Sequence, residues 1–212
     1  VHQETEGLLS PLIRDIRLRA VSSMIAAGTT VVDLGCGEGY LRDFLPQGCR
    51  YYGVDRVSPS SPQKFSDFLL LDIAETSTLP HLRQWLPRRP DYVTCIAVLE
   101  HLTDPAGFVA RCGELLAPNG KFIGTTPHPR GRQIHEFLAR VGICSRHGAE
   151  EHERFLGRGD IQKIAAQSGG ALALYRQFLL GLNQLFVIEY PSKADLRGSS
   201  FRPASAAQEA AS

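Results

Sequence analysis

A glycine-rich segment over residues 31–40 constrains this chain more than any other feature of its sequence. It reads VVDLGCGEGY, so an apolar β-branched pair leads into Asp33 and three alternating glycines, Gly35, Gly37 and Gly39. A helical pattern then starts at Leu41, which makes the predicted order strand, tight turn and helix. Glycines have no Cβ and tolerate positive φ, so a polar or anionic ligand can lie against the amides at the start of the helix. The segment therefore predicts a ligand-binding turn, with Asp33 as an acceptor on its rim.

The spacing of these glycines separates two classes of nucleotide ligand. A dinucleotide-binding turn has the pattern Gly-x-Gly-x-x-Gly. Here the third glycine comes one residue early, and Tyr40 stands where the dinucleotide pattern needs a small residue for helix packing. This spacing counts against an NAD-dependent oxidoreductase. The segment DLGCGEG at 33–39 instead resembles the first motif of the class I S-adenosylmethionine-dependent methyltransferases.

Further strand-like segments follow the glycine turn, and they resemble their counterparts in this family, in order. The segment YYGVDR at 51–56 reads as a second strand, and Asp55 lies about twenty residues beyond the glycines, an offset at which a carboxylate accepts both hydroxyls of a ribose. The segment FLLLDI at 68–73 reads as a fully buried parallel strand closed by Asp72, which we expect to accept from the adenine amino group. Residues 91–102 and 121–127 predict a fourth and a fifth strand.

The resemblance implies an α/β fold with a Rossmann-like, seven-stranded, mostly parallel sheet, an antiparallel edge hairpin and helices on both faces. It implies S-adenosyl-L-methionine as the cofactor. The methyltransferase domain is expected over residues 29–190, after an N-terminal helical segment over 1–28 and before a flexible tail over 191–212. The expected cofactor-binding residues are Asp33, Gly35, Cys36, Gly37, Gly39, Asp55, Arg56, Asp72, Ile73 and Ala97.

Helices and the late strands are predicted from periodicity and capping. Apolar residues recur at helical spacing over residues 8–27 and stop at Gly28. Asp104 is a candidate N-cap for a helix that begins at Pro105 and buries Phe108, Val109, Cys112, Leu115 and Leu116. A last helix is expected over residues 160–171, followed by hairpin strands over 172–179 and 184–190. Residues 128–158 lack a regular pattern, and the resemblance implies that they form an acceptor-binding insertion.

Methyl transfer needs few catalytic groups, because the sulfonium supplies an activated methyl group and the enzyme mainly positions the acceptor. The candidate catalytic residues are His101 and His152, as a general base or as donors that orient the acceptor. The pair Glu100–His101 resembles part of the E-x-x-E-H segment of the ubiquinone-biosynthesis O-methyltransferases and of the small-RNA 3′-end 2′-O-methyltransferases. In those families that segment is associated with a divalent metal. Ala97 replaces its first glutamate here, so we predict no metal site. Two alternatives to a catalytic role remain: a metal site at this segment, and a purely structural role in which Glu100 and His101 brace the loop.

The composition of the chain limits which classes of partner and which cellular compartment we expect. The formal net charge is +1, and the arginines after residue 127 are interleaved with glutamates, which argues against a nucleic-acid substrate. Five cysteines without a C-x-x-C pair suit a reducing cytoplasm. No apolar run reaches the length of a membrane span, and no basic leader opens the sequence. The oligomeric state is not predicted.

We therefore predict a cytoplasmic, single-domain methyltransferase that acts on a small molecule or biosynthetic intermediate, with oxygen the favoured acceptor atom. Within the same class, the alternative is an RNA or protein methyltransferase. From another class, the alternative is a non-catalytic S-adenosylmethionine-binding module that acts through a partner.

Overall fold

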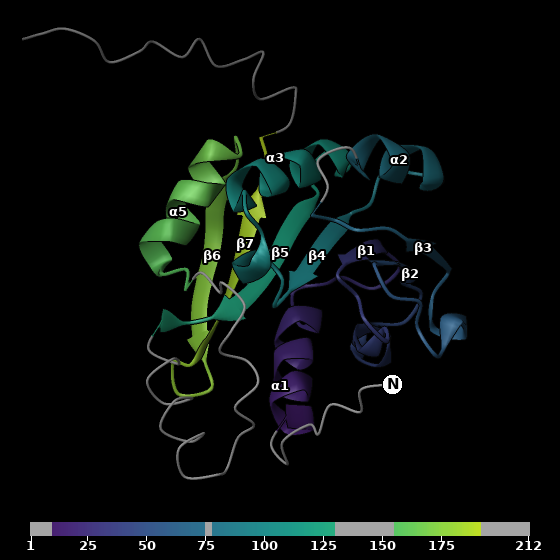
Figure 1. The fold of residues 1–212 in the computed structure, drawn as a ribbon, viewed down its shortest axis with the longest axis horizontal. Helices are drawn as coiled ribbons and strands as arrows, with labels where there is room; N and C mark the ends of the chain where they lie inside the picture. The colour runs from purple at the N-terminus through teal and green to yellow at the C-terminus, as the bar shows by residue number, and fades with distance from the viewer. Residues whose placement is uncertain (1–9, 75–77, 130–154, 192–212) are drawn as a thin grey trace, which may run out of the picture.

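A seven-stranded sheet forms the centre of the structure, a computed structural model that describes residues 10–74, 78–129 and 155–191 (Figure 1). Across the sheet the strand order is β3-β2-β1-β4-β5-β7-β6. The first five strands are parallel, and β7 is antiparallel to both β5 and β6. This confirms the mostly parallel sheet with an antiparallel edge hairpin. The strands are β1 (Thr30–Leu34), β2 (Arg50–Asp55), β3 (Asp67–Leu70), β4 (Tyr92–Ile96), β5 (Lys121–Pro127), β6 (Ala171–Phe178) and β7 (Asn183–Glu189).

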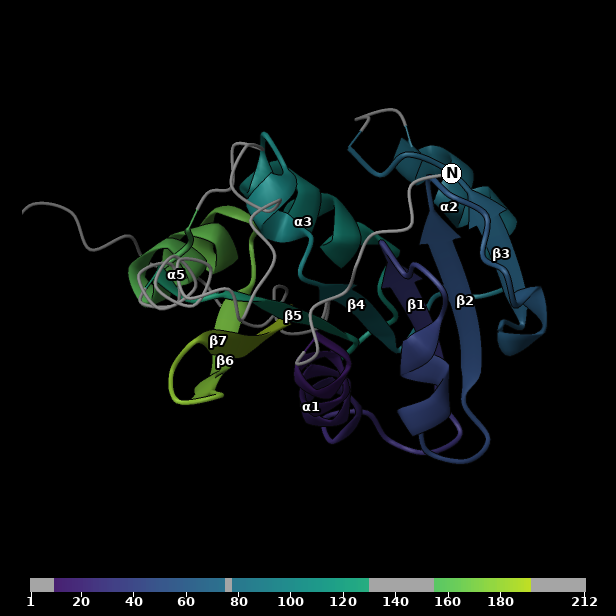
Figure 2. The same cartoon turned by 60° about the horizontal axis from the view of Figure 1, so that its bottom comes forward.

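Helices cover both faces of this sheet, as predicted. Helix α1 (Ser10–Ser22) and the short 3-10 helix η1 (Tyr40–Phe44) pack on one face. Helices α2 (Thr78–Trp85), α3 (Pro105–Leu115) and α5 (Arg158–Gln167) pack on the other. Figure 2 shows α1 on the opposite side of the sheet from α2 and α3. None of the helices in the described ranges is long and apolar enough to cross a membrane.

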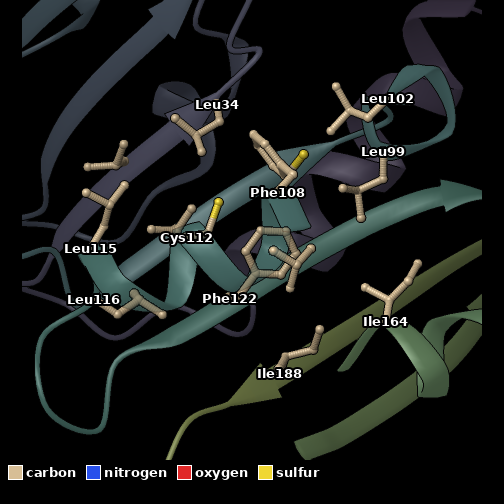
Figure 3. Close-up of a cluster of buried hydrophobic side chains, with 14 of the residues drawn as sticks. Leu34, Leu99, Leu102, Phe108, Cys112, Leu115, Leu116, Phe122, Ile164 and Ile188 are labelled. Carbon is tan, nitrogen blue, oxygen red and sulfur yellow. The ribbon is translucent and has the colours of Figure 1, made fainter. Parts of the chain in front are cut away.

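The core is divided into two apolar layers because successive side chains of a strand point to opposite faces. Val31 of β1 joins the layer under α1, whereas Val32 and Leu34 join the layer under α3. In this second layer, Phe108 and Cys112 of α3 pack over Phe122 of β5 (Figure 3). Full burial of a phenylalanine side chain contributes about 1.5–3 kcal/mol, so this packing stabilises the contact between α3 and the sheet.

Helix α3 starts as predicted. Its N-cap Asp104 accepts a hydrogen bond of 2.9 Å from the Gly107 amide through Oδ1, and Pro105 occupies the first turn. The predicted buried face is confirmed, since Phe108, Val109, Cys112, Leu115 and Leu116 are all buried.

Two sequence-based expectations are corrected, and one helix was not predicted. The helix expected from Leu41 is only the five-residue η1, because Leu45 is already extended and the chain must return to start β2 at Arg50. The segment 68–73 is not fully buried: β3 is the edge strand of the sheet, and Leu70 is 57% exposed. Helix α2 has no counterpart among the predicted elements, since Pro80 lies in its first turn.

Candidate active site

The carboxyl ends of β1, β2 and β4 meet at the point where the strand order reverses. Strand β1 lies between β2 and β4, although β4 is not its neighbour in sequence. Open α/β sheets bind ligands in the crevice at such a switch point. The glycine turn follows β1, Asp55 ends β2 and Ala97 follows β4. The structure thus brings most of the predicted cofactor residues to one edge of the sheet.

Gly37 and Asp55 form the rim of this site. The Gly37 amide donates a hydrogen bond of 2.8 Å to Oδ2 of Asp55, and the Val57 amide donates one of 3.1 Å to Oδ1. Gly37 has a φ of +50°, and a Cβ built on it meets nothing within 4 Å. Each carboxylate oxygen keeps acceptor capacity beyond one protein donor. An open glycine beside a carboxylate is a cradle that fits a ligand carrying hydroxyl groups.

The other two glycines of the turn serve packing. A Cβ on Gly35 would lie 2.5 Å from Cγ2 of Val98, and a Cβ on Gly39 would lie 2.4 Å from Cζ of Phe65. Gly35 therefore lets the segment after β4 approach the turn, and Gly39 lets an aromatic ring lie beneath it. Cys36, between them in the turn, is buried.

Asp33 does not lie on the rim, as the sequence suggested, but inside the sheet. It is 3% exposed, and its carboxylate accepts hydrogen bonds from the Tyr51 hydroxyl (2.6 Å) and the Thr94 hydroxyl (2.7 Å). Burial raises the pKa of Asp33 to about 6, the two hydrogen bonds oppose this, and the charge of Asp55 adds to it. Both carboxylate oxygens serve protein donors, so the Asp33 side chain supports the turn from within.

The residues after β2 and β3 lie at the open edge. Arg56 and Asp72 are exposed, and Oδ1 of Asp72 accepts a hydrogen bond of 2.9 Å from the Ala74 amide. Ile73 is partly buried and packs on the apolar layer under α3. The Leu71 amide donates to the Asp55 carbonyl at 2.8 Å, which ties the segment carrying Asp72 to the end of β2.

Ala97 adopts an unusual backbone conformation directly after β4. Its φ is +55°, a left-handed value that is uncommon for a residue with a Cβ. The Ala97 amide donates to the Thr125 carbonyl at 2.9 Å, which holds the strained residue against β5. Such strain concentrates at ligand-binding positions, and no sequence signal marks an alanine for this conformation.

A buried polar cluster, made of Arg17, Glu100 and Thr126, lies beyond the end of β4. Glu100 belongs to the 3-10 helix η3 (Leu99–His101) and is 3% exposed. Its Oε2, the Nε of Arg17 and the Oγ1 of Thr126 are buried and have no hydrogen-bond partner in the described parts of the chain. A terminal nitrogen of Arg17 donates a hydrogen bond of 2.9 Å to Oδ1 of Asn183. Sequence reasoning missed Arg17 and Thr126, because only packing brings α1 and β5 next to η3.

The electrostatics of this cluster follow from its burial. Burial raises the pKa of Glu100, and its own backbone amide, His101, Thr126 and Arg17 oppose the increase. Burial lowers the pKa of the Arg17 guanidinium, and the charge of Glu100 opposes that decrease. The two charges interact, but no ion pair joins them in the described ranges. The cluster therefore places the Glu100 carboxyl group, whose pKa is raised, near the Arg17 guanidinium. Both side chains keep a polar atom that could form a further hydrogen bond.

Of the two candidate catalytic histidines, the structure describes only His101. His101 is exposed in η3, and its amide donates to the Val98 carbonyl at 3.0 Å. His152 lies outside the described residues. Among residues 10–74, 78–129 and 155–191, no group of three or more histidine, cysteine, aspartate or glutamate side chains is arranged to hold a metal ion.

Comparisons with known proteins agree with this geometry. The family described as "Methyltransferase domain" matches residues 6–172. The ubiquinone biosynthesis O-methyltransferase of Leptothrix cholodnii is 31% identical over 78% of this chain and 76% of its own length. The enzyme of that name from Thiobacillus denitrificans is 29% identical over 74% of this chain and 71% of its own length.

Solved structures show the same fold at low sequence identity. The magnesium protoporphyrin IX methyltransferase of Synechocystis with bound S-adenosylhomocysteine has a TM-score of 0.61 at 18% identity, covering 89% of this chain and 90% of that one. The 1,6-didemethyltoxoflavin-N1-methyltransferase of Burkholderia thailandensis has a TM-score of 0.62 at 17% identity, covering 87% and 84%. The chain belongs to the methyltransferase-domain family and is an S-adenosylmethionine-dependent methyltransferase.

Proposed function

We propose that this methyltransferase transfers a methyl group to an oxygen of a small-molecule acceptor. The main observation behind this proposal is that the Gly37–Asp55 rim lies next to the segment after β4 that holds Glu100. The cofactor and the acceptor must bind side by side for the methyl group to be transferred. The O-methyltransferase names of the curated relatives support oxygen as the acceptor atom. The near-neutral charge supports a small molecule over a nucleic acid.

The cofactor placement is part of this proposal. Asp55 accepts from the ribose hydroxyls, Asp72 accepts from the adenine amino group, and the methionine portion lies over Gly37. When bound, S-adenosylmethionine supplies a methyl group activated by a sulfonium. The open space at Gly37 and the acceptor capacity of Asp55 support this arrangement. Backbone contacts from the turn, Arg56, Ile73 and Ala97 complete the proposed contact set.

The acceptor side of the site rests on fewer described residues. His101, exposed next to Glu100, orients the acceptor in this proposal. The proposed acceptor-binding insertion over residues 128–158 lies mostly outside the described residues, as does the tail beyond residue 191. We place the reaction in the cytoplasm, because a reducing compartment suits the free, buried thiols of Cys36, Cys49, Cys95 and Cys112.

A methyl-transfer assay with labelled S-adenosylmethionine tests the proposal. The acceptor panel consists of phenols, aliphatic alcohols, thiols, amines, transfer RNA and a protein extract, and S-adenosylhomocysteine is quantified in parallel. We expect methyl ethers from hydroxyl acceptors and no labelled RNA or protein. Labelling of RNA or protein alone would contradict the proposal. Cofactor binding without turnover on any acceptor would instead support a binding module.

A further inference from the structure

The buried polar cluster of Arg17, Glu100 and Thr126 is incomplete as it stands. Buried polar groups in folded proteins are nearly always hydrogen-bonded, so an unpartnered group asks for an explanation. Here three side chains from three different elements each keep a buried polar atom without a partner in the described ranges. We propose that this cluster binds the reacting hydroxyl group of the acceptor, with Glu100 as the general base and Arg17 as the donor that orients it. This inference rests on the proposed function.

The sheet register places the three side chains at one location. Strand β4 ends at Ile96, which is paired with Thr125, so the chain leaves β4 beside Thr126 and reaches Glu100 within one short turn. Thr126 is paired with Gln184, and the next pair joins Pro127 to Asn183. Because Arg17 donates to Asn183, its guanidinium lies at the same end of β5. The cluster thus lies at the carboxyl ends of β4 and β5.

The same register places the cluster beside the cofactor rim. Val98 lies against Gly35 of the glycine turn, two residues before Glu100 in the chain. Ala97 is held at positive φ by its hydrogen bond to Thr125, which turns the chain from β4 into η3. One short segment therefore contacts the cofactor turn at Val98 and carries the carboxylate at Glu100. A group bound at the cluster lies next to the proposed position of the methyl group.

The unused hydrogen-bonding capacity selects a hydroxyl group. Oε2 of Glu100 can accept a hydrogen bond, the Nε–H of Arg17 can donate one, and the Thr126 hydroxyl can do either. A hydroxyl group both donates and accepts, so it satisfies Glu100 and Arg17 together. A carboxylate has no proton to donate to Glu100, and an ammonium group cannot accept from Arg17. The donor set therefore favours an alcohol or phenol.

The proton transfer follows from this pairing. The acceptor O–H bond breaks, the proton passes to Oε2 of Glu100, and the oxygen keeps the electron pair with which it bonds to the methyl carbon. The electron pair of the broken S–CH₃ bond remains on sulfur. Burial favours the protonated form of Glu100, which makes its carboxylate a stronger base than an exposed glutamate. The charged or titratable neighbours that act on Glu100 are Arg17 on α1, His101 on η3 and Cys95 on β4.

The test compares Glu100→Gln with wild-type enzyme on two matched probes, phenol and benzenethiol. Benzenethiol ionises near neutral pH and needs no base, whereas phenol does. We expect phenol methylation to fall about 100-fold or more, the size expected for a lost general base, while benzenethiol methylation and S-adenosylhomocysteine affinity stay close to wild type. Glu114→Gln, on the exposed side of α3, is the matched control. Equal losses on both probes, or no loss on phenol, would overturn the base assignment.

Arg17→Met tests the orienting donor while keeping the length of the side chain. We expect the KM for phenol to rise about tenfold, in line with loss of one charge-assisted hydrogen bond, and kcat to fall less than in Glu100→Gln. Arg83→Met, an exposed arginine on α2, is the control. A KM that does not change in Arg17→Met would remove Arg17 from the acceptor site.

A spectroscopic measurement separates this inference from the proposed function. In difference infrared spectra with S-adenosylhomocysteine bound, addition of phenol should perturb a carboxyl band that Glu100→Gln lacks. Absence of that perturbation overturns the inference even if the enzyme methylates oxygen elsewhere. If the band responds but no hydroxyl acceptor is methylated, the hydroxyl-binding cluster stands and the proposed function fails.

Discussion

The hydroxyl of Tyr51 donates a hydrogen bond of 2.6 Å to the carboxylate of Asp33, inside the sheet and two residues before the glycine turn. Thr94 donates a second bond of 2.7 Å from β4. These bonds link β1 to both of its neighbours, β2 and β4. The strand that leads into the cofactor turn is therefore fixed by a buried, hydrogen-bonded acid.

Tyr51→Phe should destabilise the fold by about 1–3 kcal/mol near pH 7.5, because it leaves a buried carboxylate without one of its two donors. Urea unfolding followed by circular dichroism measures this free energy. Tyr52→Phe is the matched control, since Tyr52 is the next residue of β2, faces the opposite apolar layer and packs edge-on against Trp85. Equal losses in the two variants would contradict the role given to the Tyr51 hydroxyl.

The raised pKa of Asp33 predicts a stability that falls as the pH rises. The folded protein binds this proton up to about pH 6, whereas an ordinary aspartate has a pKa of 3.8. Between these values the folded state holds more protons than the unfolded state, so stability is lost with increasing pH. The loss from Asp33 amounts to about 3 kcal/mol. Asp33→Asn lacks this titration, so the stability difference between wild type and variant should change by most of that amount, about 2.5 kcal/mol, from pH 4 to 7.5. Parallel pH profiles of stability in the two proteins would contradict the prediction.

Gly37→Val should abolish cofactor binding with only a modest loss of stability. The new Cβ meets no protein atom within 4 Å, so the fold accommodates it, although a positive φ costs about 1–2 kcal/mol for a residue with a side chain. Gly169→Val is the matched control, since Gly169 also has a positive φ and an open Cβ position, but follows α5. Calorimetry with S-adenosylhomocysteine should show loss of binding only in Gly37→Val, and unchanged affinity there would show that the turn does not face the ligand.

Asp55→Ala should weaken S-adenosylmethionine binding by about 1.5–3 kcal/mol for each lost hydrogen bond. The Gly37 amide donates a hydrogen bond to Asp55, and the variant removes this contact within the rim as well. Asp43→Ala removes an exposed acid from η1 and serves as the control. Calorimetric titration of both variants decides the point, and an Asp55→Ala protein with wild-type affinity would place the ribose elsewhere.

Removal of divalent metal ions should leave turnover unchanged. Ala97 stands where the metal-associated segment has glutamate, so the site lacks one negative charge and one oxygen ligand of the kind that Mg²⁺ prefers. The measurement is turnover after chelation, followed by add-back of Mg²⁺, Mn²⁺ and Zn²⁺ in turn. If chelation stops the reaction and one ion restores it, Glu100 and His101 act as metal ligands rather than through proton transfer.

Local motifs of the sequence predicted most element positions, and the family resemblance that these motifs carry implied the fold class and the cofactor. The spacing of the glycines at 35, 37 and 39 distinguished a turn that binds S-adenosylmethionine from one that binds a dinucleotide. In either kind of turn a few adjacent residues contact the ligand, so their spacing is visible in the sequence. Residues 121–127 form β5 as predicted, and Asp104 caps α3, because alternation and capping act between near neighbours in the chain. The antiparallel hairpin of β6 and β7 followed from the family resemblance.

Tertiary structure alone decided what the buried polar side chains near the site face. Asp33 looked like a rim residue, but the pairing of β1 with β2 and β4 buries it between Tyr51 and Thr94. The position of β3 at the sheet edge, which no local pattern encodes, exposes a strand that its apolar sequence suggested was buried. Arg17 meets Glu100 only because α1 packs across the sheet onto the end of β5. Spacing along the chain reports neighbours within a turn or a strand, whereas burial and charge pairing between distant segments depend on how the layers pack.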